Sequence, residues 1–580
     1  MPFLNTIPPR ALDRTTAPPV SPRERWLVLA ALTLASMAAI VVSARHHAWL
    51  FYGDAEAHLH IARRIFDSHR PGLSQLGSVW LPLPHLLLAP FAAITPWWRS
   101  GFAAVLPSAL CYLAAALGLY RLARIWIHPL PALFALAFFA LNPNLLYLQT
   151  TAMTEPLFLA ELVWSVLLLV RWHSSLDDPP AACLRIGALH LWPLTLTLIA
   201  AAWTRYDGWI LGFGIWLWMA LALHRRRALF QRRFILASFA LLAAPLLWML
   251  YNAIYFGDGL DFMRGPYSAA AIEARTSHGM VPPHPGWHNP WISALFFWHA
   301  STGDAFARSF VGWLLLLLSL FGLFVVLRMV RRARNTPRRA ALAATLLLWF
   351  PLPFYAYSVA WGSVPIFLPD WWPHSFYNTR YGMEMLPAFA FTLGVAADWL
   401  LARLAEARPS SHPSAQLRAV APQTGTLVAA MACLFLANTG QMIAQHPLVY
   451  VEATRNFAAR GAYTQTLAAA LARLHALDPD ALTLVETSDF PSIIPLAGLT
   501  YRQTLNESDY LYFRAALAAP ASHVAIILAF DGDAVADAVR AHPQDLRLLA
   551  RFAAPGQPDS ALYVSTLSPL AHAVLSTAPR

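Results

Sequence analysis

Ionisable side chains are concentrated in a stretch that directly follows a long apolar segment. Residues 51–70 read FYGDAEAHLHIARRIFDSHR and place the carboxylates Asp54 and Glu56 close to His58. His58 follows Asp54 by four residues, so on a helix the two side chains share one face. A carboxylate in such a setting can take a proton from a hydroxyl group, and a neighbouring histidine can orient it. The stretch therefore predicts acid–base chemistry early in the chain.

Each of these residues also has a structural interpretation. An acidic residue near a helix N-terminus complements the helix dipole, which accounts for Asp54 but not for Glu56. Glu56 can be interpreted equally well as a charge at the helix terminus or as a site residue. For His58, a role in orienting Asp54 and no role at all are both open. Arg63 and Arg64 are interpreted as interfacial cations that face lipid headgroups.

Four later segments carry further polar residues between apolar runs: TAMTEPLF (151–158), WTRYDGW (203–209), residues 251–300, and PDWWPHSFYNTRYGMEM (369–385). Their arginines are permanent cations that can form charge-assisted hydrogen bonds to phosphate oxygens. The candidate site residues in these segments are Glu155, Arg205, Tyr206, Tyr267, Asn378, Arg380 and Tyr381. In the earlier loop, Trp80 and His85 are candidates for lining a donor groove.

The composition identifies the class of protein that must position these groups. Hydrophobic residues make up 58% of the 580 residues and charged residues only 12%, which is too apolar for a soluble chain. The sequence therefore predicts a polytopic α-helical membrane protein. The net charge of +11 comes from arginines in short loops rather than from a basic tail, so no nucleic-acid partner is expected. No disulfide is expected from Cys111, Cys183 and Cys433.

Eleven membrane-spanning helices are expected, and arginine counts in the loops set their orientation. The expected spans are 26–44, 101–120, 130–148, 155–171, 187–203, 209–223, 234–252, 309–329, 338–360, 383–402 and 424–441. All Arg-rich loops then lie in the cytoplasm, provided that the proline-rich segment 79–97 lies at the outer interface. If 79–97 crosses instead, those loops move outside. Ser78 and Asn289 are expected to be accessible from outside, and Thr336 is not.

Three regions follow from this topology. Residues 1–25 form a cytoplasmic tail, 26–444 a transmembrane domain whose first outer loop spans 45–100, and 445–580 a small extracytoplasmic α/β domain. Short apolar runs around a helix with an acidic start favour that last assignment. We expect the terminal domain to be a structural or acceptor-facing lid. The location expected is the inner membrane of a bacterium, with the terminal domain in the periplasm.

The ordered set of outer-loop motifs resembles a known enzyme family. GDAEAHLHIARRI is followed by the interfacial WLPLPHLLLAP, a second carboxylate in MTEPLF, and the Thr–Arg pair of WTRYDGW. This order is similar to that of the C-type (GT-C) membrane glycosyltransferases, in the branch of the protein O-mannosyltransferases and the lipid A aminoarabinose transferase. The resemblance covers roughly residues 26–400. One departure is that Ala55 separates Asp54 from Glu56, where the family often has adjacent Asp and Glu.

The resemblance implies transfer of a hexosyl or mannosyl-type sugar from a polyprenyl-phosphate donor to a protein, lipid or glycan acceptor at the outer membrane surface. Inversion at the sugar needs one carboxylate base, and Asp54 is the candidate, with Glu56 and Glu155 as further catalytic residues. The donor phosphate and sugar are assigned to the residues Arg205, Tyr206, Arg380, Tyr381, Asn378, Tyr267, His58, Trp80 and His85. Mg²⁺ or Mn²⁺ is an open expectation, with Asp54, Glu56 and Glu155 as ligands.

Two other functions remain open at this point. A flippase or transporter for lipid-linked sugars would share the membrane character and the basic outer rim. An oligosaccharide ligase would use the same face with a diphosphate-linked donor.

Overall fold

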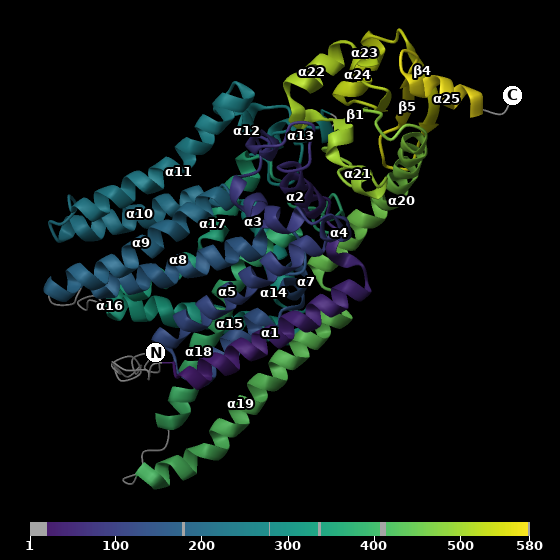
Figure 1. Cartoon of the computed structure of the whole chain (residues 1–580). Helices are drawn as coiled ribbons and strands as arrows, with labels where there is room; N and C mark the ends of the chain where they lie inside the picture. Colours follow the sequence, from purple (N-terminus) through teal and green to yellow (C-terminus); the bar gives the residue numbers. More distant parts are fainter. Residues whose placement is uncertain (1–19, 177–179, 278, 334–337, 407–412, 578–580) are drawn as a thin grey trace.

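A computed structural model describes residues 20–176, 180–277, 279–333, 338–406 and 413–577. Most of these residues are helical and form a bundle, with a small sheet-containing domain at one end (Figure 1). The first 19 residues of the expected tail, and Thr336, lie outside the described residues.

The bundle consists of long helices joined by shorter ones. The long helices are α1 (Pro22–Arg45), α5 (Phe102–Trp126), α8 (Glu155–Ser175), α9 (Pro180–Thr204), α10 (Asp207–Arg225), α11 (Arg232–Phe256), α15 (Phe310–Arg332), α18 (Leu386–Glu406) and α19 (Pro413–Ala444). The shorter ones are α6 (Pro129–Ala140), α7 (Pro143–Leu148), α12 (Asp261–Arg264), α13 (Ala269–Thr276), α14 (Pro290–Ala305), α16 (Arg338–Ala344), η4 (Thr345–Trp349), α17 (Pro351–Trp361) and η5 (Thr379–Met385).

Nine helical segments among the described residues are long and apolar enough to cross a membrane. The protein is therefore a multi-pass membrane protein, but the expected count of eleven spans is not established. The segment 130–148 is broken, because the Asn142 side chain accepts hydrogen bonds from the N–H groups of Asn144 (2.9 Å) and Leu145 (3.2 Å) and starts α7 there. In α9, the apolar part that is described, Leu189–Thr204, is also shorter than each of the nine candidate spans.

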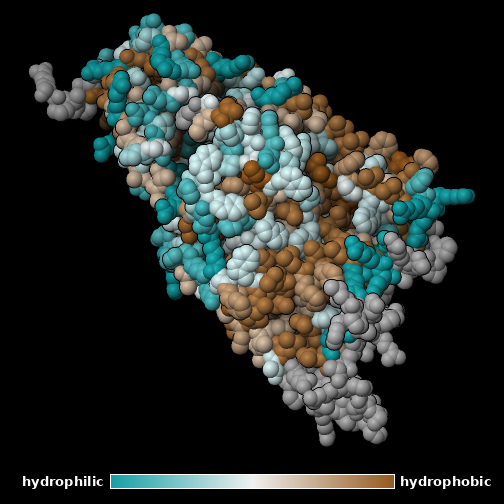
Figure 2. All heavy atoms as spheres, turned by 180° about the vertical axis from the view of Figure 1, so that it is seen from behind, coloured by the Kyte–Doolittle hydropathy of each residue, from teal (hydrophilic) through white to brown (hydrophobic). Residues whose placement is uncertain are grey.

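The surface of the bundle is that of a lipid-exposed protein. Hydrophobic side chains cover much of the bundle, whereas hydrophilic side chains gather on the terminal domain (Figure 2). On α11, Phe239 and Ile254 are each 66% exposed. Such a face is unusual in a soluble protein and fits contact with lipid. The Arg-rich connection between α10 and α11 lies at the end of the bundle away from the terminal domain (Figure 1).

Five short helices follow α1 and lie at the end of the bundle that carries the terminal domain (Figure 1). They are η2 (Ala48–Leu50), α2 (Gly53–Arg64), η3 (Leu73–Leu76), α3 (Pro82–Ala92) and α4 (Thr95–Ser100). The 11 residues of α3 span about 16 Å. A bilayer core is about 30 Å thick, so segment 79–97 does not cross it as a helix.

The interpretation of Arg63 and Arg64 as lipid-facing cations is wrong, because both are buried, at 7% and 6% exposure. The Arg63 guanidinium pairs with Asp67 at 2.9 Å and donates to the carbonyl oxygens of Ala92 (3.0 Å) and Ala93 (2.7 Å), at the C-terminus of α3. Arg64 lies 4.0 Å from Glu507 of the terminal domain. These charges hold elements together within the protein.

The terminal domain has a five-stranded sheet in the order β2-β1-β3-β5-β4. The strands are β1 (Thr483–Val485), β2 (Thr504–Leu505), β3 (Ile526–Phe530), β4 (Leu546–Phe552) and β5 (Ser560–Ser565). The helices around it are α20 (Leu448–Leu477), α21 (Ile493–Leu496), η6 (Tyr501–Gln503), η7 (Glu507–Asp509), α22 (Leu511–Ala518), α23 (Pro520–His523), α24 (Ala534–Ala541) and α25 (Pro569–Thr577). β1 is parallel to β2 and β3, whereas β5 is antiparallel to β3 and β4. All five residues of β3 are buried, as expected for a central strand.

The 30-residue helix α20 belongs both to the bundle and to the terminal domain. It contacts α7, α14 and η5 of the bundle, and it also contacts α21 and α25 of the terminal domain. Figure 1 shows it as the connection between the two parts. The sequence predicts that the terminal domain begins at residue 445, which would place all of α20 in it, although this helix also packs on the bundle.

Three histidines are buried where α2 packs against α3 and α4. His58 Nδ1 lies 2.9 Å from His85 Nε2, and Trp98 Nε1 donates to His60 Nδ1 at 2.7 Å. Burial lowers the pKa of His58 and of His60 from 6.5 to about 3, and it lowers that of His85 as well. These side chains are therefore neutral in the folded protein near pH 7.

The neutral histidines predict that mild acid destabilises the protein. Between about pH 6.5 and 3 the unfolded chain binds protons that folded His58 and His60 exclude, so the free energy of unfolding falls as the pH falls. The loss is up to about 1.4 kcal/mol per pH unit for each histidine. Thermal unfolding in detergent should show a lower Tm at pH 5 than at pH 7. His60→Asn, which keeps a hydrogen-bond acceptor for Trp98, should reduce the pH dependence, and exposed His542→Asn is the control.

The arginine asymmetry predicts which end of the bundle faces outward. Ser78 is buried and is a poor probe, so we choose exposed Gln544 in the terminal domain and exposed Gln231 beside the Arg-rich end. In a background with all three native cysteines replaced by serine, Gln544→Cys should react with an impermeant maleimide on intact cells. Gln231→Cys should react only after permeabilisation. The opposite labelling pattern would reverse the orientation.

Candidate functional site

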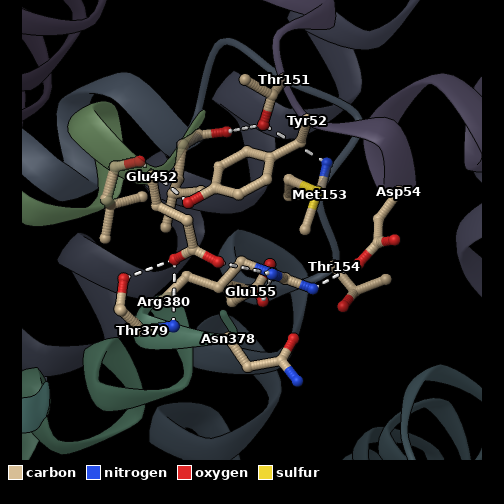
Figure 3. A network of polar contacts seen from close by, with 12 residues as sticks. Tyr52, Asp54, Thr151, Met153, Thr154, Glu155, Asn378, Thr379, Arg380 and Glu452 are labelled. Atoms are coloured by element: carbon tan, nitrogen blue, oxygen red, sulfur yellow. Dashed lines mark hydrogen bonds and ion pairs between the residues drawn. The ribbon is translucent and has the colours of Figure 1, made fainter. Parts of the chain in front are cut away.

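The guanidinium of Arg380 is buried among three carboxylates that come from distant parts of the chain (Figure 3). It forms ion pairs with Asp54 from α2, with Glu155 from α8 (3.1 Å) and with Glu452 from α20 (3.5 Å). Asp54 and Glu155 thus share one cation, as a common site requires. Both carboxylates are in the first turn of their helices, where the helix dipole favours negative charge.

The loop that carries Arg380 is fixed from two sides. The backbone N–H of Thr379 donates to Glu452 at 3.0 Å, and its hydroxyl donates to the same oxygen. Gly382 packs directly on α14, and a Cβ there would lie only 2.5 Å from the backbone nitrogen of Ser301. A glycine is therefore required for η5 to approach α14 this closely.

Arg205 forms a second buried cluster. Its guanidinium pairs with Asp207 (3.0 Å) and Glu384 (3.2 Å), and it donates to the hydroxyl groups of Tyr355 (2.6 Å) and Thr154 (3.1 Å). Asp207 is 2% exposed, so it does not turn to solvent. Asp207 therefore forms a local ion pair with Arg205, and it would compete with a phosphate group for the guanidinium.

A tight turn sets the position of Arg205 between α9 and α10. The Arg205 N–H donates to the Ala201 carbonyl oxygen at 3.1 Å, and the Gly208 N–H donates to the Arg205 carbonyl oxygen at 3.0 Å. A Cβ at Gly208 would lie 2.1 Å from the Ala201 oxygen. The chain can reverse here only because residue 208 has no side chain.

The two clusters meet at Glu155 and Tyr381. Glu155 Oε1 lies 3.1 Å from Arg380 and 3.8 Å from Arg205. The Tyr381 ring centroid lies 5.2 Å from the Arg380 guanidinium and 5.0 Å from that of Arg205, within the range of cation–π contacts. The predicted residues Asp54, Glu155, Arg205, Arg380 and Tyr381 therefore form one continuous group.

Exposure separates Asp54 from the other carboxylates of this group. The Asp54 side chain is 44% exposed, whereas the side chains of Glu155, Asp207, Glu384 and Glu452 are 5% exposed or less. Two guanidinium groups face five carboxyl groups, so the group has more acidic than basic side chains. A molecule arriving from solvent meets Asp54 first.

His58, His85 and Trp80 form a separate buried contact beside the ion pairs. The ring centroids of His58 and Trp80 are 4.4 Å apart, and those of His58 and His85 are 5.0 Å apart. The charges of Arg380 and Arg205 contribute, after burial, to lowering the pKa of His58. His58 therefore lies near the two arginines, but it shares no described hydrogen bond with Asp54.

Three predicted residues lie at the edge of the site or outside it. The Tyr206 hydroxyl donates to the Val79 carbonyl oxygen at 2.6 Å, and the amide of Asn378 donates to the Pro365 carbonyl oxygen at 2.9 Å. Tyr267 lies against Glu486 of the terminal domain, and burial raises its pKa. None of the three contacts the guanidinium of Arg205 or Arg380 among the described interactions.

Glu56 points away from Arg380 and pairs with Arg460 of α20. The three expected metal ligands, Asp54, Glu56 and Glu155, therefore do not face a common position. Within the described ranges, no group of three or more His, Cys, Asp or Glu residues is arranged to hold a metal ion.

Sequence reasoning missed Glu384, Glu452 and Tyr355 as partners of the two arginines. Glu384 lies in η5, two residues before the apolar helix α18 begins, and a carboxylate at such a place is itself a signal for a buried partner. Glu452 was not identifiable in this way, because it was assigned to the terminal domain. Tyr355 lies in an ordinary aromatic-rich segment and gives no signal.

No protein-family model matches the sequence, and no curated protein matches it by sequence. Solved structures do match. The structure of ArnT from Cupriavidus metallidurans in the apo state aligns with a TM-score of 0.53 at 14% identity, over 97% of this chain and 100% of that chain. The structure of the same ArnT bound to undecaprenyl phosphate aligns with a TM-score of 0.50 at 14% identity, over 96% and 99%. The chain therefore has the fold of the GT-C membrane glycosyltransferases.

Proposed function

We propose that the protein transfers a sugar from a polyprenyl-phosphate donor to an acceptor hydroxyl at the membrane surface beside the terminal domain. The observation that carries this proposal is the position of Asp54, an exposed carboxylate that a buried arginine holds in place. The match to ArnT, which has been solved with undecaprenyl phosphate, supports the class of donor. We place the reaction on the periplasmic side of a bacterial inner membrane, with a protein, lipid or glycan as the acceptor.

In this mechanism Asp54 accepts the proton of the acceptor hydroxyl while the acceptor oxygen attacks the anomeric carbon of the sugar. The bond between that carbon and the phosphate oxygen breaks, and polyprenyl phosphate leaves. The displacement inverts the anomeric centre. A double displacement would need a second accessible carboxylate as nucleophile. Glu155 and Glu452 do not fit that role, because both are buried and paired with Arg380.

We assign the donor phosphate to Arg205, which is the more exposed of the two arginines, at 15% against 5% of the side chain. A shallow groove lined by Pro84, Leu87, Leu88, Pro107, Ser108, Cys111, Thr151, Ala152, Met153, Thr154 and Leu157 lies beside it. Thr154 links groove and cation, because its hydroxyl accepts the hydrogen bond from Arg205. The end of a prenyl chain next to the phosphate would fit this small, mostly apolar groove and would bring the phosphate to Arg205.

The charge of the group favours a monophosphate donor. A polyprenyl phosphosugar is a phosphodiester with one negative charge, and a diphosphate-linked sugar carries two. Five carboxyl groups surround two guanidinium groups, and those that are ionised repel a second phosphate charge more than a single one. This argument favours a glycosyltransferase of the monophosphate type over an oligosaccharide ligase. Because the expected metal ligands Asp54, Glu56 and Glu155 do not face a common position, the proposed mechanism includes no step at Mg²⁺ or Mn²⁺.

Asp54→Asn should abolish transfer and leave donor binding intact. Asparagine keeps the size and a hydrogen-bond acceptor for Arg380 but cannot take the acceptor proton. The loss in kcat should be about 100-fold or more. The measurement is transfer of radiolabelled sugar by the purified protein, with donor binding followed separately. Asp258→Asn, which removes an exposed carboxylate outside the site, is the control. Full transfer by Asp54→Asn would contradict an enzymatic role for Asp54, whereas donor binding without any transfer by the wild type would favour a carrier of lipid-linked sugars.

Arg205→Lys should lower kcat/KM for the lipid donor by about tenfold or more, which corresponds to about 1.4 kcal/mol. Lysine keeps the charge but loses the planar fork that can bind two phosphate oxygens. The matched control is Arg264→Lys, at an exposed ion pair outside the site. Near-wild-type transfer by Arg205→Lys would remove Arg205 from the donor site.

A further inference from the structure

One face of helix α20 contacts both the loop that carries Arg380 and the start of α2, which carries Asp54. Val449, Glu452, Asn456 and Arg460 are three or four residues apart and therefore lie in a row along the helix. Glu452 holds the loop of Arg380 through the arginine itself and through Thr379. The remaining residues of the row contact the start of α2.

The start of α2 has its partners on α20 rather than within its own sequence. The N-cap residue of α2, Tyr52, makes no side-chain hydrogen bond to the first turn. Instead, the side chain of Asn456 accepts a hydrogen bond from the Gly53 N–H at 3.0 Å. The Tyr52 hydroxyl donates to the Val449 carbonyl oxygen at 2.8 Å. An orphan N–H of the helix terminus is thus satisfied by a cap from another helix.

Arg460 completes this contact. Its guanidinium pairs with Glu56, donates to the Phe51 carbonyl oxygen at 3.2 Å and donates to the Asn456 side chain at 3.2 Å. The side chains of Arg460 and Glu56 are 11% and 5% exposed. Asp54 therefore sits between Gly53 and Glu56, two residues that α20 holds directly.

We propose that Asn456 and Arg460 are positioning residues that hold the first turn of α2 so that Asp54 meets Arg380. The inference rests on the proposed function, because it assigns the clamp a part in the reaction of Asp54. Neither residue touches the substrate. Because the same helix carries Glu452, α20 fixes Asp54 and Arg380 relative to each other, and the terminal domain at its far end anchors the helix.

This proposal gives Glu56 a structural role instead of a catalytic one, and an experiment can distinguish the two roles. A catalytic Glu56 requires the carboxylate, whereas a clamped Glu56 needs only an acceptor for Arg460. Glu56→Gln should therefore lower kcat less than Arg460→Gln does, because the glutamine oxygen still accepts a hydrogen bond from Arg460.

Arg460→Gln should lower kcat by about 10- to 100-fold and leave KM for the lipid donor unchanged, because a misplaced base costs rate rather than donor binding. The double variant Glu56→Gln with Arg460→Gln leaves no unpaired buried carboxylate and should lose kcat to the same extent. Arg460→Lys can still pair with Glu56, so this variant should keep part of the kcat that Arg460→Gln loses. Arg473→Gln, at an exposed arginine on the same helix, is the matched control.

Hydrogen exchange of the α2 amides supplies a readout that does not depend on activity. Exchange at Gly53 and the following residues should be faster in Arg460→Gln and in the double variant than in the Arg473→Gln control. Near-wild-type kcat together with unchanged exchange in both variants would overturn the proposal, as would loss of transfer in Glu56→Gln alone. If the wild type transfers no sugar, the proposed function fails, and exchange alone still decides whether Arg460 holds α2.

Discussion

The structure depends on how a buried guanidinium, that of Arg380, is neutralised. A charged side chain removed from water is costly, and it is tolerated only when partners of opposite charge and hydrogen bonds surround it. Arg380 finds three carboxylates, on α2, α8 and α20. If α8 or α20 moved away, the pairing of Arg380 with the buried Glu155 or Glu452 would be lost, and if α2 moved away, Asp54 would lose the cation that holds it. The requirement therefore joins the loop of residues 45–100, the bundle and the helix that leads to the terminal domain at one point.

This constraint also accounts for the many charges in residues 51–70. Asp54 belongs to the ion-paired group, Glu56 and Arg64 face α20 and the terminal domain, and Arg63 caps the end of α3. The stretch is charged because α2 packs against polar partners on several sides. The same packing leaves the carboxylate of Asp54 partly open to solvent, where the proposed reaction needs it.

The sequence was sufficient to predict the membrane class, the non-crossing proline-rich helix and the GT-C fold, because these follow from hydropathy, length and the order of the outer motifs. It was also sufficient to bring Asp54, Glu155, Arg205 and Arg380 forward as candidates, since ionisable residues stand out in an apolar chain. It failed where a role depends on a partner far away in sequence. Arg64 resembles any interfacial cation until Glu507 is placed beside it, and the row from Glu452 to Arg460 reads as an ordinary polar face of a helix.

The central claim is that a single exposed carboxylate, held by Arg380, supports a one-step displacement at the sugar. The anomeric configuration of the transferred sugar tests it most directly. NMR of the product should be compared with NMR of the polyprenyl phosphosugar that the purified protein consumes. The account predicts that the configuration is inverted. Retention would contradict it, because retention requires a second nucleophile, and the other carboxylates around the two arginines are buried and paired.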